Sequence, residues 1–224
     1  MLLFRSARVF LVLAWAGLGA LPALAKPELP SVQGPWNSSD YVDAIFAVRN
    51  GVITLPRRGN PKTEAFFDRL IDRGNIDHLM AGPENAAEKR QRILLILSAT
   101  GEFRGRYGYA VALGDDVGHE LIDIQIFRLA LIGQLALLAE PEACCDAAAA
   151  TALLGTLDTL AEARTFPGDR LVALAQALAA SYPLIRPRLA GPDQGAIDAR
   201  LGRLVARAED PALKAALAAA RHGN

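Results

Sequence analysis

The chain has 224 residues, of which 24 are lysine or arginine and 24 are aspartate or glutamate, so its formal net charge is zero. Nucleic-acid-binding proteins carry a basic patch or a basic domain, so this balance excludes no fold but argues against a nucleic-acid partner. The only two cysteines, Cys144 and Cys145, are adjacent and cannot cross-link distant parts of a fold.

The N-terminus has the features of a secretory signal peptide. Arg5 and Arg8 precede an apolar stretch, and Ala23-Leu24-Ala25 ends it as a small-x-small cleavage sequence. We therefore predict a cleaved signal peptide over residues 1–25 and a periplasmic or secreted protein. The excess of arginine over lysine, 20 to 4, suggests bacterial coding bias and favours the periplasm.

After this cleavage the chain would carry 22 basic and 24 acidic residues. No later stretch reaches the ~18 uncharged apolar residues of a transmembrane helix, so the sequence predicts no span in the mature protein. In an oxidising compartment, Cys144 and Cys145 could remain buried thiols or form a vicinal disulfide. They could also pair between chains or bind a metal, and the sequence leaves these alternatives open.

The mature chain is predicted to begin with an irregular leader over residues 26–38, which is rich in proline and has Trp36 as an anchor. A single all-α domain follows over residues 39–224. We divide it into a core half, 39–139, and a region of Ala- and Leu-rich helical hairpins, 140–224. The expected fold is a compact array of about seven or eight helices around a buried central helix.

Capping signals place the first helices. Ser39 or Asp40 can begin a helix that ends at Asn50-Gly51, where glycine allows a left-handed C-cap. Asn60-Pro61 is an N-cap followed by a first-turn proline. We expect Arg73-Gly74 to end that second helix and residues 75–80 to form only a short turn or half-helix.

A long helix is predicted from Pro83-Glu84 to about residue 113. Gly101, Gly105 and Gly108 would share one face of it, which would let another helix approach closely. On this interpretation Gly105→Leu should strongly destabilise the protein. Residues 103–113 also alternate in polarity as a strand would, but the helical pattern before them favours helix.

The next helix, His119 to Ala139, is apolar around nearly its whole circumference and is predicted to be the buried central helix. Polar residues inside it need partners. Arg104 and Arg106 are candidate partners for Glu120 and Asp123. The alternative is that these polar groups form the floor of a pocket.

Beyond Glu140-Pro141 we expect helices at about residues 143–164, 169–182, 192–208 and 211–221, with Pro183 among the residues that end them. Their many alanines allow tight helix packing but bury little area each. The sequence therefore predicts that the large residues between Phe66 and Leu138 supply most of the stability.

One short string suggests chemistry. On a helix, His119 and Asp123 would lie one turn apart and could hold a metal with a third ligand, Glu120 acting as general base. Acidic residues in a first helical turn are also favoured by the helix dipole, which is the simpler explanation. The sequence has no phosphate-binding loop or nucleophile motif, so no catalytic residue and no cofactor is assigned.

Three functions follow as hypotheses. The first is a non-enzymatic module that binds another periplasmic protein or a peptide. The second is a carrier of a small apolar ligand or lipid, in a cavity lined by Phe103, Tyr107, Tyr109, Ile126 and Phe127. Its predicted ligand-binding residues are Arg104, Arg106, Tyr107, Asp123 and Arg128. The third is a metal-dependent hydrolase centred on His119, Glu120 and Asp123.

Overall fold

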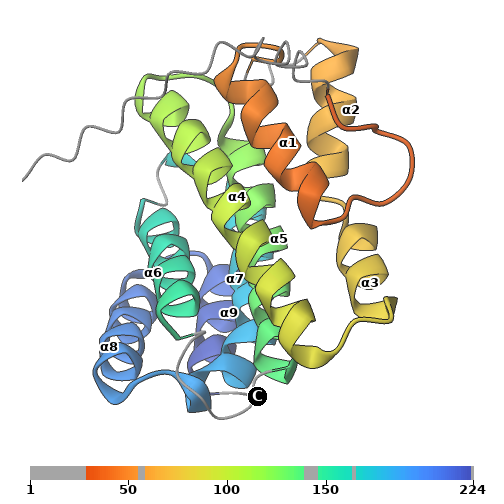
Figure 1. Ribbon diagram of the computed structural model, residues 1–224. Helices are drawn as coiled ribbons and strands as arrows, with labels where there is room; N and C mark the ends of the chain where they lie inside the picture. The colour runs from red at the N-terminus through yellow and green to blue at the C-terminus, as the bar shows by residue number, and fades with distance from the viewer. Residues whose placement is uncertain (1–28, 55–58, 139–145, 163–164, 223–224) are drawn as a thin grey trace, which may run out of the picture.

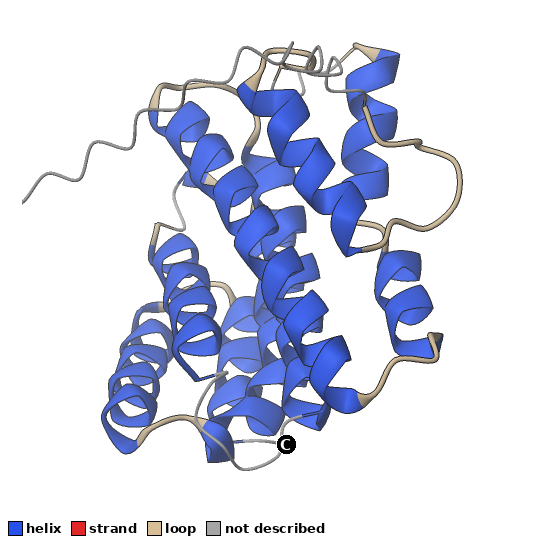
Figure 2. Cartoon of the chain, viewed as in Figure 1, coloured by secondary structure: helices blue, strands red, loops and turns tan. Residues whose placement is uncertain are grey.

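The computed structural model describes residues 29–54, 59–138, 146–162 and 165–222. These residues are all-helical, with no strand, and form a compact array of nine α-helices and one short 3₁₀ helix (Figures 1 and 2). The elements are α1 (Ser38–Arg49), α2 (Pro61–Leu70), α3 (Arg73–Ala81), α4 (Ala86–Ala112), α5 (Gly118–Leu138), α6 (Asp146–Ala161), α7 (Gly168–Ile185), η3 (Arg186–Arg188), α8 (Gly191–Arg207) and α9 (Pro211–His222). The predicted signal peptide and both cysteines lie outside the described residues.

The described residues form nine α-helices where about seven or eight were predicted, and one reason is that Arg73-Gly74 begins a helix instead of ending one. Asp72 is the N-cap of α3, and its side chain accepts a hydrogen bond from the backbone N–H of Gly74 at 2.8 Å. A carboxylate in this position satisfies one of the free N–H groups of the first turn. The segment expected as a half-helix is therefore a complete nine-residue helix.

Residues 101–112 are helical, as predicted, but the face that α4 buries is not its glycine face. A Cβ added to Gly105 or Gly108 would meet nothing within 4 Å. The buried face instead carries Ile96, Phe103 and Tyr107. Burying these large side chains removes far more apolar surface from water than burying glycines would. The prediction of close helix approach through Gly105 is therefore wrong.

α5 packs against α4, α6 and α7. It runs antiparallel to α4, since Arg90 near the start of α4 donates to the carbonyl of Leu138 at the end of α5. It runs parallel to α7, because Gly118 lies against Phe166 and Gly133 against Ser181. α5 begins at Gly118, one residue before its predicted start.

Among the described helices, α5 has the length and mean hydropathy, 1.8, that a membrane span would need. In the structure, 67% of its most apolar window is buried inside the protein. Helices in the core of a large bundle have the same apolar composition.

Helices α1, α2 and α3 lie on the opposite side of the α4–α5 pair from α6 and α8 (Figure 1). Aromatic rings join them to α4: Trp36 contacts Tyr41 and Phe66, and Phe66 contacts Phe103. Trp36 is 2% exposed, so it anchors the residues before α1, as predicted.

In the C-terminal region, α7 packs extensively against both α5 and α9, and α8 packs against α9 and α6. Pro183 does not end α7, which continues to Ile185. A proline removes one helical hydrogen bond. Tyr182 and Ile185, both buried, hold this last turn against its neighbours.

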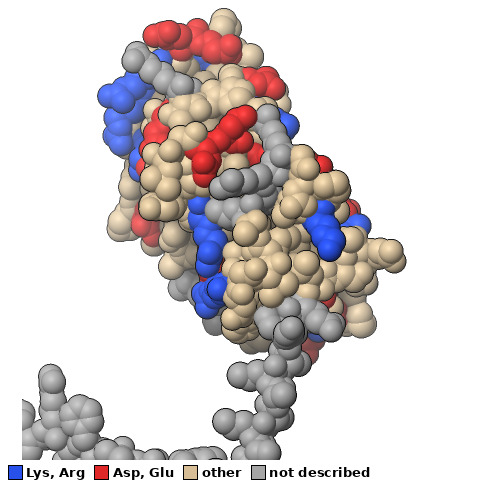
Figure 3. All heavy atoms as spheres, turned by 90° about the horizontal axis from the view of Figure 1, so that it is seen from above, with Lys and Arg blue, Asp and Glu red and all other residues tan. Residues whose placement is uncertain are grey.

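Figure 3 shows acidic and basic side chains interspersed on one face of the molecule.

Candidate functional site

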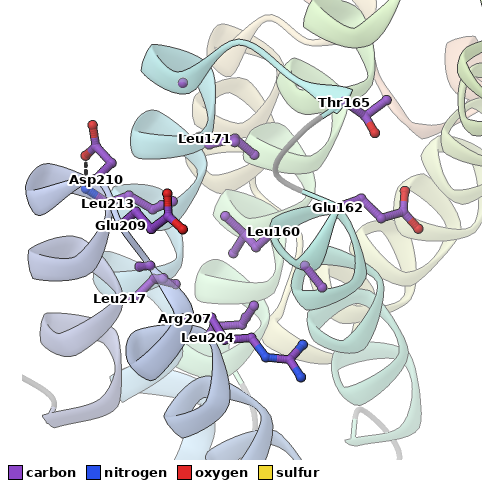
Figure 4. A pocket seen from close by; sticks show the side chains of 13 residues that line it. Leu160, Glu162, Thr165, Leu171, Leu204, Arg207, Glu209, Asp210, Leu213 and Leu217 are labelled. Carbon is purple, nitrogen blue, oxygen red and sulfur yellow. Dashed lines mark hydrogen bonds between the residues drawn. The ribbon is translucent and has the colours of Figure 1, made fainter.

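A pocket of about 680 Å³ lies where four helices begin or end: the end of α6, the start of α7, the end of α8 and the start of α9 (Figure 4). Five leucines from these helices form its floor: Leu160, Leu171, Leu204, Leu213 and Leu217. Each of them is at most 8% exposed. Pockets of about 300–1,000 Å³ are the usual size for small ligands.

The rim of the pocket is polar. Glu162, Thr165, Arg207, Glu209 and Asp210 line it and are exposed. Asp210 has a structural role, because its carboxylate accepts a hydrogen bond from the N–H of Leu213 at 2.7 Å in the first turn of α9. Arg207 and Glu209 have no ion pair among the residues that the structure describes.

Local sequence explains why helices end here. Pro211 occupies the first position of α9, where its missing N–H costs nothing. Ala208, the C-cap of α8, has extended backbone angles and turns the chain within three residues. The small side chains at Ala161, Gly168 and Ala208 leave the space between the helix ends unfilled.

The sequence did not predict this pocket, and none of the residues expected to line a cavity takes part in it. Phe103, Tyr107 and Phe127 are at most 2% exposed and fill the core around α4 and α5, whereas Tyr109 is 68% exposed. The amphipathic pattern of α8 and α9 identifies their buried leucines. It carries no signal that the leucines of four helix ends border one space.

Arg128, a predicted ligand-binding residue, is a buried core residue. Its Nη1 donates to the carbonyl oxygen of Leu97 at 2.5 Å and to the hydroxyl of Thr100 at 3.1 Å. Burial and the nearby charge of Arg104 lower the pKa of Arg128 to about 10. A Cβ added to Gly101 would lie 3.0 Å from this Nη1, so Gly101 makes room for the guanidinium.

Gly155 makes room for the guanidinium of Arg104, as Gly101 does for that of Arg128. The Nη2 of Arg104 donates to the carbonyl oxygen of Gly155 on α6 at 3.2 Å, and a Cβ on Gly155 would lie 3.0 Å from the guanidinium carbon. The Nε of Arg104 is buried without a hydrogen-bond partner in the described structure. Arg104 and Arg128 thus belong to a buried polar junction of α4, α5 and α6.

Tyr107 and Arg106 lie in different surroundings. The Tyr107 ring is fully buried against Phe67, and its hydroxyl has no hydrogen-bond partner in the described part of the chain. Burial, reinforced by the charge of Glu120, raises the pKa of Tyr107. Arg106 pairs with Glu102 at 3.1 Å, one turn away on α4, instead of with Glu120 or Asp123.

His119 and Asp123, the predicted metal ligands, converge on Arg170 of α7. The Nε of Arg170 donates to Nδ1 of His119 at 3.0 Å, and its Nη1 donates to a carboxylate oxygen of Asp123 at 3.1 Å. Burial raises the pKa of Asp123 above its ordinary value, and the charge of Arg170 offsets only part of this rise.

No group of three or more His, Cys, Asp or Glu residues that could hold a metal ion occurs within the described ranges. Arg170 is 47 positions from Asp123 in sequence. A pairing over that distance has no local sequence signal. For this reason Arg104 and Arg106 were predicted as the partners of Asp123 instead.

The three groups of polar residues therefore differ in what they can do. The Arg104–Arg128 and His119–Asp123–Arg170 groups join helices, whereas the rim of the pocket is exposed and its Arg207 and Glu209 are available to a ligand. Comparison of the chain with protein-family models, with curated proteins and with solved structures finds no match in any of the three.

Proposed function

We propose that the protein is a non-enzymatic binding protein that holds a small amphipathic ligand in the pocket between α6, α7, α8 and α9. The single observation that carries this proposal is the pocket itself, with about 680 Å³ of space over five leucines. An apolar floor with a few polar groups at the rim is the usual arrangement in small-molecule sites. The floor would hold an apolar group and the rim would orient a polar one.

This proposal takes up the carrier hypothesis, with a different pocket from the one expected. The floor leucines are almost completely buried and accessible only from within the pocket, which suits a small ligand better than the surface of a protein partner. The described lining holds no histidine or cysteine. The expected periplasmic location, which depends on residues 1–25, remains part of the proposal.

Saturable binding of a neutral apolar dye tests the proposal. Nile red fluorescence, titrated with the purified protein, should reveal one site per chain. Ala161 lines the pocket from the exposed end of α6, so Ala161→Trp should fill the pocket without disturbing the core and weaken binding at least about tenfold, or 1.4 kcal/mol.

The matched control is Ala147→Trp, an exposed position at the other end of α6 that does not line the pocket. It should bind the dye as the unsubstituted protein does, and both variants should keep the unsubstituted melting temperature. Absence of saturable binding, or equal affinity of the two variants, would contradict the proposal.

A further inference from the structure

Two charged residues of the rim, Arg207 and Glu209, lie close together in the sequence at the end of α8. Arg207 is the last residue of α8 and Glu209 follows it after Ala208. Both side chains are exposed and line the pocket. Neither forms an ion pair with the other, or with any other described residue, at an N–O distance of 4.0 Å or less. Each charge is therefore available to a ligand.

The other two carboxylates of the rim are placed differently. The carboxylate of Asp210 is engaged by the N–H of Leu213. In Figure 4, Glu162 points away from the space that the leucines enclose, whereas Glu209 lies beside Leu213 at the edge of that space. The side chains left to orient a ligand are thus the guanidinium of Arg207 and the carboxylate of Glu209, and the exposed carboxylate of Asp210 adds negative charge next to Glu209 in the sequence.

A ligand that matches this arrangement carries opposite charges of its own on an apolar body. An ammonium group would be received by Glu209 and a carboxylate by Arg207, which can form two parallel hydrogen bonds to a carboxylate. The leucine floor would hold aliphatic side chains between the two charged ends. A ligand with a single charge would gain only one of these two charge-assisted contacts.

We infer that the ligand is a short aliphatic peptide with a free amino and a free carboxyl terminus, bound with its ammonium group at Glu209 and its carboxylate at Arg207. This inference rests on the proposed function, because it names the ligand class of the same pocket. It makes Arg207 and Glu209 the specificity-determining residues and the leucines the source of affinity.

Displacement of Nile red by trileucine tests the inference. Peptide with both termini free should compete best, and N-acetylation or C-amidation should each weaken competition about tenfold, as expected for the loss of one charge-assisted hydrogen-bonded contact. In Glu209→Gln, acetylation should no longer matter while amidation still does. In Arg207→Gln, the reverse should hold.

Asp77→Asn is the matched control, because Asp77 is exposed on α3, across the α4–α5 pair from the pocket. This variant should discriminate between the peptides as the unsubstituted protein does. Equal competition by free and doubly capped trileucine would overturn the inference, and so would an absence of competition by any peptide. In either case, binding of Nile red itself would still support the proposed function. Stronger competition by dodecylphosphocholine than by trileucine would overturn it in favour of a zwitterionic lipid. Failure of Nile red to bind would overturn the proposed function itself.

Discussion

The side of the molecule formed by α1, α2 and α3 on α4 differs from the side formed by α6 to α9 in the size of the side chains that join its helices. Aromatic rings contact one another in the first region, as between Trp36 and Tyr41, which pack edge to face with centroids 5.4 Å apart. In the second region most of the buried apolar side chains are leucine and alanine, and α7 packs extensively against α9.

A buried hydrogen-bonding side chain also joins the elements of the first region. Asn75 is 1% exposed, accepts from the backbone N–H of Trp36 at 2.7 Å and donates to the hydroxyl of Tyr41 at 2.9 Å. One side chain thus joins the residues before α1 to α1 and α3. Small residues in the second region let helices approach closely, but where four helices end they leave the pocket open. Large side chains therefore specify a filled core, whereas small ones permit a binding site.

The largest expected effect is the loss of Trp36. Trp36→Ala should lower the free energy of unfolding by about 3–5 kcal/mol, because it removes a buried ring that contacts two others and leaves a cavity. Urea unfolding followed by circular dichroism measures this. The control is Tyr109→Ala, at an aromatic residue that is 68% exposed, which should change stability by less than about 0.5 kcal/mol.

A leucine of the pocket floor should cost less. Leu217→Ala should destabilise by about 2 kcal/mol, the lower end for buried leucines, because one side of Leu217 already borders open space. The same urea experiment applies. A loss as large as that of Trp36→Ala would remove the contrast between the two regions.

The glycines of α4 should separate into two kinds. Gly105→Ala should stabilise the protein by about 1 kcal/mol, since the new methyl group meets nothing and helix propensity improves. Gly101→Ala should give no such gain, because its Cβ would lie 3.0 Å from the buried guanidinium of Arg128. If thermal melting showed equal stabilisation in both variants, Gly101 would not be needed to hold Arg128.

The smallest effect concerns acid pH. The pKa of Glu102 is lowered by its hydrogen bond from Arg49, and the pKa of Asp198 by its hydrogen bond from Arg186. A carboxyl group with a lowered folded pKa stabilises the protein above its unfolded pKa, about 4, and this contribution is lost as the pH falls through the folded pKa.

Glu102→Gln, which removes the ion pair between α1 and α4, and Asp198→Asn, which removes the one between η3 and α8, should therefore each reduce stability at pH 7. Both variants should converge with the unsubstituted protein near pH 2. Urea midpoints across this range test the two regions separately. A difference that persists at pH 2 would mean that the side chains act through packing instead of charge.

Much of the helical architecture could be predicted because its signals are local. Asn60-Pro61 begins α2, Asn50-Gly51 ends α1, and the hydrophobic pattern identifies α5 as a mostly buried helix. There were two exceptions. The N-cap at Asp72 is a local signal that the interpretation of the sequence missed, whereas α7 continues past Pro183 where Tyr182 and Ile185 are buried against neighbouring helices. The candidate pocket could not be predicted, since Leu160 and Leu217 are far apart in the chain.

The sequence by itself determined the all-helical fold and most of the helix ends, because capping and periodic burial depend on residues only three or four positions apart. Only the tertiary structure decided which polar groups meet. It paired Asp123 with Arg170, placed Arg128 against Gly101 and left a space between four helix ends. Such contacts depend on how whole helices pack. Packing also determined which face of α4 is buried, namely the face with Phe103 and Tyr107 and not the face with the glycines.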